Sequence, residues 1–540
     1  MSGSPTDTPD ALEAESPSGS LRPLLEVAFD EARISAIARE LREGRDGGTP
    51  VEVAVSSPAR PFLIAAFSEA ASAVDPTLVV TADDRSARQT AESLGSFLDA
   101  SRIHLYPSRG VGFRSHLAPP PHLAGLRVAA LSSMTSDEGW EPGMAPIVVA
   151  SAVALAESVP EAALRPKPVD ISVGSEADLE LLSVELTDAG YKRVDQVTER
   201  GEFAIRGGIC DVFGATDSRA ARIELFGDEV EEIRWFSTFT QRSLGEIDSI
   251  ELAPASELVT EHRAVHLPGE GDDPAATVEL AEIIPLDRFV SPLDLVPRSA
   301  RLVVVSEEEI WRSLRDLSED VEAALGKEGA AGLYVEIEDE VSSRASLTLG
   351  PPGEDPDWAV RAQRADFASR TPAEAEAELE KLARSGYRVV VTFPGKGEAE
   401  RTRYAFARLD PPLLGDSDPP ASGEVTFAVA SLSEGFISPD LKLCVAPWPS
   451  LVARRSPDRE GQGSGAARLA NAIELRVGDF VVHSDHGIAR FAGFETKTVA
   501  GVTRDYLELE YEGEDRVFSP TDQLARISRY VGAEGAELRL

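Results

Sequence analysis

The segment closest to a phosphate-binding loop is Pro394–Gly397, which reads PGKG. It follows the strand-like run YRVVVTF and precedes the helical run GEAERTRYAFARL, so Lys396 is expected near a helix N-terminus, where anions bind well. The motif is incomplete, because a phosphate loop ends in Gly-Lys followed by Ser or Thr. An ordinary strand-to-helix turn is therefore the favoured interpretation, with anion binding at Lys396 as the alternative.

Two other sets of residues could hold a metal or act as nucleophiles. His483 and His486 lie close together in the sequence, but no third ligand is near them, so they are expected to be turn residues. Cys210 and Cys444 are too few for a disulfide framework or a zinc cage and are typical of a cytosolic protein with reduced thiols. We therefore predict no metal site, no catalytic residue and a cytoplasmic location.

Length and charge limit the class of protein. At 540 residues the chain is too long for one hydrophobic core, and we expect roughly three to five domains. Its 93 acidic and 53 basic residues disfavour independent nonspecific DNA binding and favour protein partners, although acidity can also serve solubility alone. Met1–Ser20 lacks the features of a signal peptide, and no stretch reaches the ~18 apolar residues of a membrane span. We expect a monomer without membrane contact.

The order of strand-like and helical runs predicts an α/β multidomain protein. Strands and helices alternate between Glu52 and Glu157, as in a doubly wound parallel sheet, and Pro285–Leu325 returns to this order. The second stretch is expected to complete the first sheet after an inserted α+β domain, and a β-barrel is expected at the C-terminal end. The expected boundaries are a disordered tail at 1–22, the α/β domain at 23–160 and 276–348, the inserted domain at 161–258, a small α/β domain at 365–452, a flexible linker at 453–470 and the barrel at 471–540.

Within the inserted domain, Ala221–Phe226 reads ARIELF. Because strand side chains alternate between faces, Ile223 and Leu225 should face the core, whereas Arg222, Glu224 and Phe226 should face outward. An exposed Phe beside an Arg is the composition of a protein-binding hot spot, and packing of Phe226 under a neighbouring loop is the alternative. The pattern indicates a candidate docking surface.

Two stretches resemble known modules. Gly201–Ser243, with its strings RGG, RIELF and FGDE, resembles the UvrA-binding region of UvrB, and Val477–Phe491, reading VGDFVVHSDHGIARF, resembles the RNA-polymerase-binding domain of the CarD regulators. The transcription-repair coupling factor (Mfd) family joins both, and the resemblance extends from about Glu52 to Leu540. It implies a UvrB-like α/β domain, a UvrA-binding α+β domain and a CarD/Tudor-like barrel.

The resemblance also implies partners and contact residues. The residues that touch UvrA match Arg206, Arg222 and Phe226, and the strand that contacts the β subunit of RNA polymerase aligns with ETKTV, where Lys497, Thr498 and Val499 are the candidates. A partner strand added to that edge would draw part of its affinity from backbone hydrogen bonds. After Ser519–Pro520, the N-cap pattern predicts a helix with Leu524, Ile527 and Val531 facing inward.

The chemistry of a motor is absent from the residues. A UvrB-like domain would place its phosphate loop at Ser56–Phe67, but Pro58 and Pro61 remove backbone donors there, and no Gly-Lys-Ser/Thr occurs. We therefore expect no cofactor in this chain, with ATP and Mg²⁺ bound, and DNA mainly contacted, by translocase domains that it lacks. Without the domain that masks the UvrA-binding face in the family, Arg222 and Phe226 should be constitutively open.

The predicted function is that of the adaptor half of a transcription-repair coupling factor in nucleotide excision repair. It would bind stalled RNA polymerase and recruit UvrA, while the full-length family displaces the polymerase by ATP-dependent translocation. The alternatives are a CarD-like transcription regulator, which leaves residues 50–450 without a role, and a divergent helicase-like ATPase, which ATP turnover by the chain would favour.

Overall fold

The computed structural model describes residues 20–44, 49–70, 74–110, 119–135, 139–141, 143–238, 241–258, 288–330, 334–351, 356–367, 369, 371–415, 418–452, 480–483, 487–499, 502–510, 516–520 and 527–529. The chain divides into two compact units, residues 1–454 and residues 455–540, which are considered separately.

A parallel sheet organises the first unit. Its strand order is β17-β1-β16-β15-β2-β4-β3, and every pairing in it is parallel. The sheet thus combines strands from before and after residues 152–300. Its strands β2 and β4 are apolar runs buried on both faces, as is usual for parallel sheets. The strands are β1 Val51–Ala54, β2 Thr77–Thr81, β3 Ile103–Tyr106, β4 Ile147–Ser151, β15 Arg301–Val305, β16 Ala345–Gly350 and β17 Trp358–Ala359.

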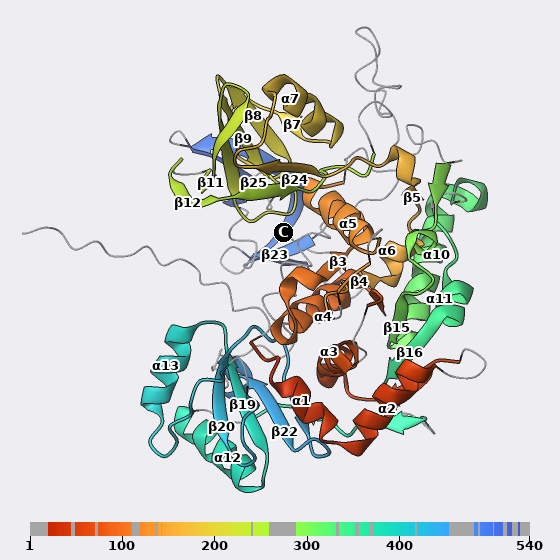
Figure 1. Ribbon diagram of the computed structural model, residues 1–540, viewed down its shortest axis with the longest axis vertical. Helices are drawn as coiled ribbons and strands as arrows, with labels where there is room; N and C mark the ends of the chain where they lie inside the picture. The colour runs from red at the N-terminus through yellow and green to blue at the C-terminus, as the bar shows by residue number, and fades with distance from the viewer. Residues whose placement is uncertain are drawn as a thin grey trace, which may run out of the picture. The chain divides into compact units, whose positions relative to one another are not determined.

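Helices cover both faces of this sheet, so the prediction of an α/β protein with a parallel sheet is confirmed. Val79 of β2 packs in the core with α1 to α4, whereas Leu78 and Val80 pack in the second core with α5, α6, α10 and α11. Figure 1 shows α10 and α11 beside β15 and β16. The helices are α1 Leu24–Phe29, α2 Ala32–Glu43, α3 Arg60–Ala70, α4 Asp84–Phe97, α5 Pro121–Ser133, α6 Ala152–Ala156, α10 Glu307–Ala330 and α11 Glu338–Arg344.

Between β4 and β15 lies a six-stranded sheet in the order β12-β11-β10-β9-β8-β7. All its pairings are antiparallel except that of β7 with β8. Helix α7 packs its buried side chains Leu182 and Leu186 into the core on one face, and Figure 1 shows it beside β7 and β8. The elements are α7 Leu179–Asp188, β7 Lys192–Arg193, β8 Glu202–Arg206, β9 Ile209–Phe213, β10 Ala220–Phe226, β11 Glu229–Phe236 and β12 Ser243–Ile247.

Smaller elements complete this unit. Two two-stranded sheets pair β6 Val169–Ser172 with β13 Ser249–Leu252, and β5 Val159–Pro160 with β14 Phe289–Val290. A five-stranded sheet in the order β18-β21-β22-β19-β20 is flanked by three helices. Its elements are β18 Gln363–Arg364, α12 Pro372–Arg384, β19 Arg388–Phe393, α13 Lys396–Ala405, β20 Val425–Val429, β21 Phe436–Ser438, β22 Leu443–Pro447 and α14 Trp448–Leu451.

The second unit is a five-stranded sheet in the order β26-β25-β24-β23-β27. Its strands are β23 Phe480–His483, β24 Gly487–Val499, β25 Val502–Glu510, β26 Arg516–Pro520 and β27 Ile527–Arg529. The predicted helix after Ser519–Pro520 is wrong at both described points, because Pro520 ends β26 and Ile527 begins a strand that pairs with β23. Pro520 is tolerated there because β26 is an edge strand. Leu524 and Val531 lie outside the described residues.

No helix in the described part of the chain is long and apolar enough to cross a membrane.

Candidate functional site: an outward sheet face, its anchor and a strand edge

The three residues predicted to contact UvrA lie on one face of the six-stranded sheet. Register places Ala204 opposite Asp211 and Asp211 opposite Arg222, so Arg206, two residues beyond Ala204, shares the face of Arg222. Phe226 is four residues beyond Arg222 on the same strand. The alternation predicted for β10 is confirmed, since Ile223 is fully buried and Leu225 packs against the same core.

Arg206 and Phe226 are the last residues of β8 and β10, and each directly precedes a hairpin turn. Arg206 precedes the turn of Gly207 and Gly208, and Phe226 precedes the turn that enters β11. The two turns are tied together, because the backbone N–H of Leu225 donates to the carbonyl of Gly208 at 2.8 Å. Gly207 has φ +60°, a left-handed conformation that would cost another residue about 1–2 kcal/mol. Glycine there allows the tight turn that leaves Arg206 at the tip.

The side chains of Phe226 and Arg222 differ in their exposure to solvent and in their contacts. The Phe226 side chain is 81% exposed, so it does not pack under a loop. Arg222 is only 21% exposed. Its Nε and Nη2 donate to the two carboxylate oxygens of Asp211 at 2.6 and 2.7 Å, and its guanidinium lies 4.8 Å from the ring centre of Phe236. The hydrogen bonds to Asp211 raise the pKa of Arg222 further above its ordinary value.

Toward the start of β10 the same face packs Ala204, Ala220 and Phe236 into a small apolar cluster, and nearer to Phe226 it carries further charged side chains. Arg234 forms ion pairs with Glu224 and Glu232. Arg206 is exposed and forms no ion pair with any residue that the structure describes. The face therefore presents an uncovered aromatic ring, one open guanidinium and one guanidinium held in place, which is the composition of a protein-binding surface rather than of a catalytic centre.

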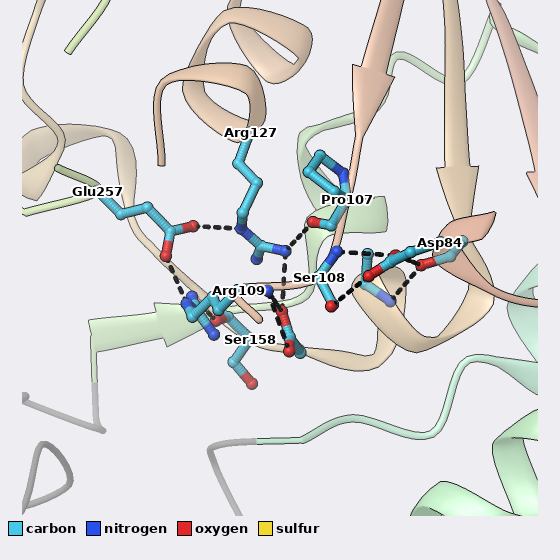
Figure 2. Close-up of polar contacts among 10 residues, drawn as sticks. Asp84, Pro107, Ser108, Arg109, Arg127, Ser158 and Glu257 are labelled. Atoms are coloured by element: carbon cyan, nitrogen blue, oxygen red, sulfur yellow. Dashed lines mark hydrogen bonds and ion pairs between the residues drawn. The ribbon is translucent and has the colours of Figure 1, made fainter. Parts of the chain in front are cut away.

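A buried group of charges anchors this sheet to the parallel sheet. Glu257, just after β13, accepts a hydrogen bond from the Nε of Arg127 at 2.8 Å and pairs with the Nε of Arg109 (Figure 2). Arg127 lies on α5, and Arg109 follows β3. Arg127 and Arg109 also bond to Glu157, which caps the C-terminal end of α6, at 2.8 Å and 3.0 Å. We call Arg109, Arg127, Glu157 and Glu257 the buried ion-pair cluster.

Burial and the neighbouring guanidinium groups shift the pKa values of the two carboxylates in the buried ion-pair cluster. The side chains of Arg127 and Arg109 are 0% and 4% exposed. Burial alone would raise the pKa of Glu257, but the two guanidinium groups outweigh it and lower that pKa to about 2. Burial raises the pKa of Glu157, which receives one guanidinium bond and one backbone N–H rather than two guanidinium bonds. The pKa values of Glu257 and Glu157 therefore shift in opposite directions because the two carboxylates have different hydrogen-bond donors.

Close packing supplements the cluster. A side chain at Gly125 on α5 would place its Cβ 2.8 Å from the Cβ of Ala215 and 3.1 Å from the carbonyl oxygen of Pro254. Only glycine lets the helix approach this closely. Beside the cluster, Asp84 accepts a hydrogen bond from the backbone N–H of Ser108 at 2.9 Å and another from Ser151 (Figure 2). The residues Ala215 and Pro254, which adjoin β9 and β13, thus pack directly against α5.

The segment expected at the position of a phosphate loop has another structure. Ser57–Ala59 forms a 3-10 turn that continues directly into α3. The buried Arg60 donates from its Nε to the carbonyl of Val55 at 3.4 Å and from Nη1 to the hydroxyl of Ser306. Val55 follows β1 and Ser306 follows β15, so a side chain of the protein occupies this edge of the sheet. Lys396 is the first residue of α13, and its solvent-exposed position is that of a strand-to-helix turn.

The predicted polymerase contacts lie at the end of β24. Lys497, Thr498 and Val499 pair with Arg504, Thr503 and Val502 of β25. On its other edge, β24 pairs with β23 only over Gly487–Arg490. Among the described strands of this unit, none pairs with that edge of β24 beyond Arg490.

The remaining candidates for chemistry are simpler. Both cysteines are buried and unbonded, and burial raises the pKa of each thiol to about 12. His483 lies in β23, and His486 lies outside the described residues. No group of three or more His, Cys, Asp or Glu within the described residues is arranged to hold a metal ion.

Sequence reasoning missed Asp211 and the buried ion-pair cluster. Asp211 stands between two buried apolar residues of β9, and a lone acid in such a strand is a signal that a partner must neutralise it. The partners in the cluster are up to 148 positions apart in the chain, and no local pattern links them.

Comparison with known proteins agrees with these two regions. The family model of the UvrB interaction domain matches residues 169–258, and that of the CarD-like/TRCF RID domain matches residues 475–531. The chain is 30% identical to the transcription-repair-coupling factors of Mycobacterium bovis and Mycobacterium tuberculosis, over 94% of this chain and 46% of each relative. It is 26% identical to that of Bacillus subtilis, over 86% of this chain and 44% of the relative.

The chain spans about half the length of the curated relatives that it matches. It contains both the outward sheet face and the strand edge within regions that match named modules. The chain is therefore similar to the transcription-repair-coupling factors over most of its own length and contains two modules that known family models describe.

Proposed function

We propose that this chain is an adaptor in transcription-coupled nucleotide excision repair, which binds UvrA through one unit and the β subunit of RNA polymerase through the other. The observation that carries the proposal is Phe226, an aromatic side chain left 81% exposed at a hairpin tip within the region that matches the UvrB interaction domain. Arg206 and Arg222 flank it on the same face and supply directional donors to UvrA.

The second proposed contact is the edge of β24 beyond Arg490, with which no described strand of this unit pairs. In this proposal a strand of the polymerase β subunit adds to the sheet beside Glu495–Val499, with Lys497, Thr498 and Val499 giving specificity. Backbone hydrogen bonds supply part of the affinity in such strand addition, so single alanine substitutions at these three positions should have modest effects.

The residues at the sheet edge also bear on where ATP binds in this proposal. Arg60 fills the position of a phosphate loop, so in this proposal residues 51–70 bind no ATP and hold no Mg²⁺. Translocation on DNA, with ATP and Mg²⁺, is proposed for the part of the family's length that this chain does not match. The chain itself is proposed to act as a monomer that contacts proteins.

A titration against purified UvrA tests the UvrA contact. Burying a Phe side chain contributes roughly 1.5–3 kcal/mol, so Phe226→Ala should weaken binding by about 10- to 150-fold. Tyr404→Ala is the matched control, because Tyr404 is 89% exposed and lies on helix α13, away from the six-stranded sheet. The proposal is wrong if Phe226→Ala binds UvrA as tightly as Tyr404→Ala does.

A further inference from the structure

We infer that Asp211 is a positioning residue for the UvrA contact, holding Arg222 in the orientation in which UvrA receives it. The inference deepens the proposed function and rests on it. Asp211 is 7% exposed and would itself make little contact with a partner, so its effect must pass through Arg222.

The geometry fixes the guanidinium on three sides. Asp211 lies directly opposite Arg222 on the neighbouring strand and engages its Nε and Nη2 at 2.6 and 2.7 Å. Phe236 lies under the guanidinium plane at 4.8 Å, and the side-chain oxygen of Gln241 accepts from Nη2 at 3.4 Å. Two parallel hydrogen bonds from one edge of a guanidinium to a carboxylate set both its position and its plane.

The opposite edge is left for a partner. Among the hydrogen bonds of the described residues, the Nη1 of Arg222 takes part in none. Because the Nε and Nη2 edge faces Asp211, Nη1 lies on the other side of the guanidinium, and the Arg222 side chain as a whole is 21% exposed. Nη1 therefore presents its two N–H donors to a carbonyl or carboxylate oxygen of UvrA.

Two effects of Asp211 oppose each other. Its negative charge offsets that of Arg222 and weakens attraction to an acidic group on UvrA. Against this, Asp211 immobilises a side chain that would otherwise lose its rotamer freedom on binding, a loss that corresponds to roughly 2- to 12-fold in Kd. We expect the second effect to dominate, because the two hydrogen bonds to Asp211 fix the orientation of the guanidinium whether the group on UvrA is charged or neutral.

The test is a set of binding titrations with UvrA. Asp211→Asn keeps the size of the side chain and removes its charge, and it should weaken binding about 3- to 10-fold. Glu251→Gln removes one negative charge from an exposed position on β13, outside the six-stranded sheet, and should stay within about twofold of wild type. In an Arg222→Ala background, Asp211→Asn should have no further effect, since there is no guanidinium left to orient.

Each outcome decides the matter. Asp211→Asn binding as tightly as wild type or more tightly would overturn the inference and mean that Asp211 competes with UvrA for Arg222. An equal loss in the wild-type and Arg222→Ala backgrounds would also overturn it, because a general disturbance of the sheet does not depend on Arg222. Asp211→Glu, which retains the charge and shifts the guanidinium, provides a second variant and should lie between Asp211→Asn and wild type.

The inference can fail without the proposed function failing. If Arg222→Ala and Phe226→Ala weaken binding but Asp211→Asn does not, only the positioning role is wrong. If neither Arg222→Ala nor Phe226→Ala changes the affinity, the proposed UvrA contact is wrong and the positioning role falls with it.

Discussion

Replacing Glu257 by Gln should destabilise the first unit by about 3 kcal/mol. The substitution keeps the shape of the side chain but removes the carboxylate charge that pairs with the guanidinium groups of Arg127 and Arg109, which are 0% and 4% exposed. Removing one partner of a buried ion pair typically costs about 3–5 kcal/mol, because the charge that remains is uncompensated.

The pKa of Glu257 leads to the same magnitude. The pKa falls from an ordinary 4.5 to about 2, because the guanidinium groups of Arg109 and Arg127 outweigh the effect of burial. A difference of about 2.5 pKa units at roughly 1.36 kcal/mol each gives about 3.4 kcal/mol. The folded pKa is lower than the unfolded one, so this stabilisation is fully present above pH 4.5 and is lost as the pH falls toward 2.

The assay is urea unfolding of the whole chain at pH 7 and at acidic pH. The wild type should approach the stability of Glu257→Gln as the pH falls from 4.5 toward 2, since Glu257 is protonated and resembles Gln in the unfolded chain first and in the folded chain only near pH 2. Glu251→Gln, an exposed position on β13, serves as the surface control and should change stability by no more than about 0.5 kcal/mol. Equal stability of Glu257→Gln and Glu251→Gln at pH 7 would refute the reasoning.

Two further predictions concern Gly125 on α5 and Asp217 in the segment between β9 and β10. Gly125→Val should destabilise the chain by about 1–3 kcal/mol through overpacking, because its Cβ would lie 2.8 Å from that of Ala215; an unchanged thermal midpoint would show that α5 can retreat. Asp217→Asn should raise stability at pH 7 but not below pH 3.8, because burial raises the pKa of Asp217 from 3.8 to about 6 and the folded state therefore loses stability as the pH rises between these values. The denaturation midpoints of the variant and the wild type at both pH values check this. An equal gain at the two pH values would contradict it.

Local patterns predicted the outward face but not the means by which it is held. Alternation in β10 was sufficient to separate Ile223 from Phe226, because period two is a property of any strand with one buried face. The pairing of Asp211 with Arg222 depends on the register of β9 against β10, which the connecting segment 214–219 does not reveal. The partners of Glu257 lie 130 and 148 positions away, so only the folded chain brings them together.

The predicted helix after Ser519–Pro520 shows that a local sequence pattern can also predict the wrong element. A Ser followed by Pro is an N-cap pattern, but it also suits the end of an edge strand, where the missing N–H of Pro520 is not needed. Pairing of Ile527–Arg529 with β23 is a nonlocal contact, and it decides between the two. The degenerate phosphate loop was predictable as a loss of glycines, whereas the occupation of its position by Arg60 was not.

The most direct test of the adaptor function is retention of UvrA on immobilised RNA polymerase β subunit. With the wild-type chain present, UvrA should be retained, and without the chain it should wash through. The Phe226→Ala chain should still bind the β subunit but retain about 10- to 150-fold less UvrA at limiting concentration. Equal retention of UvrA by the wild-type and Phe226→Ala chains, or none by either, would contradict the account.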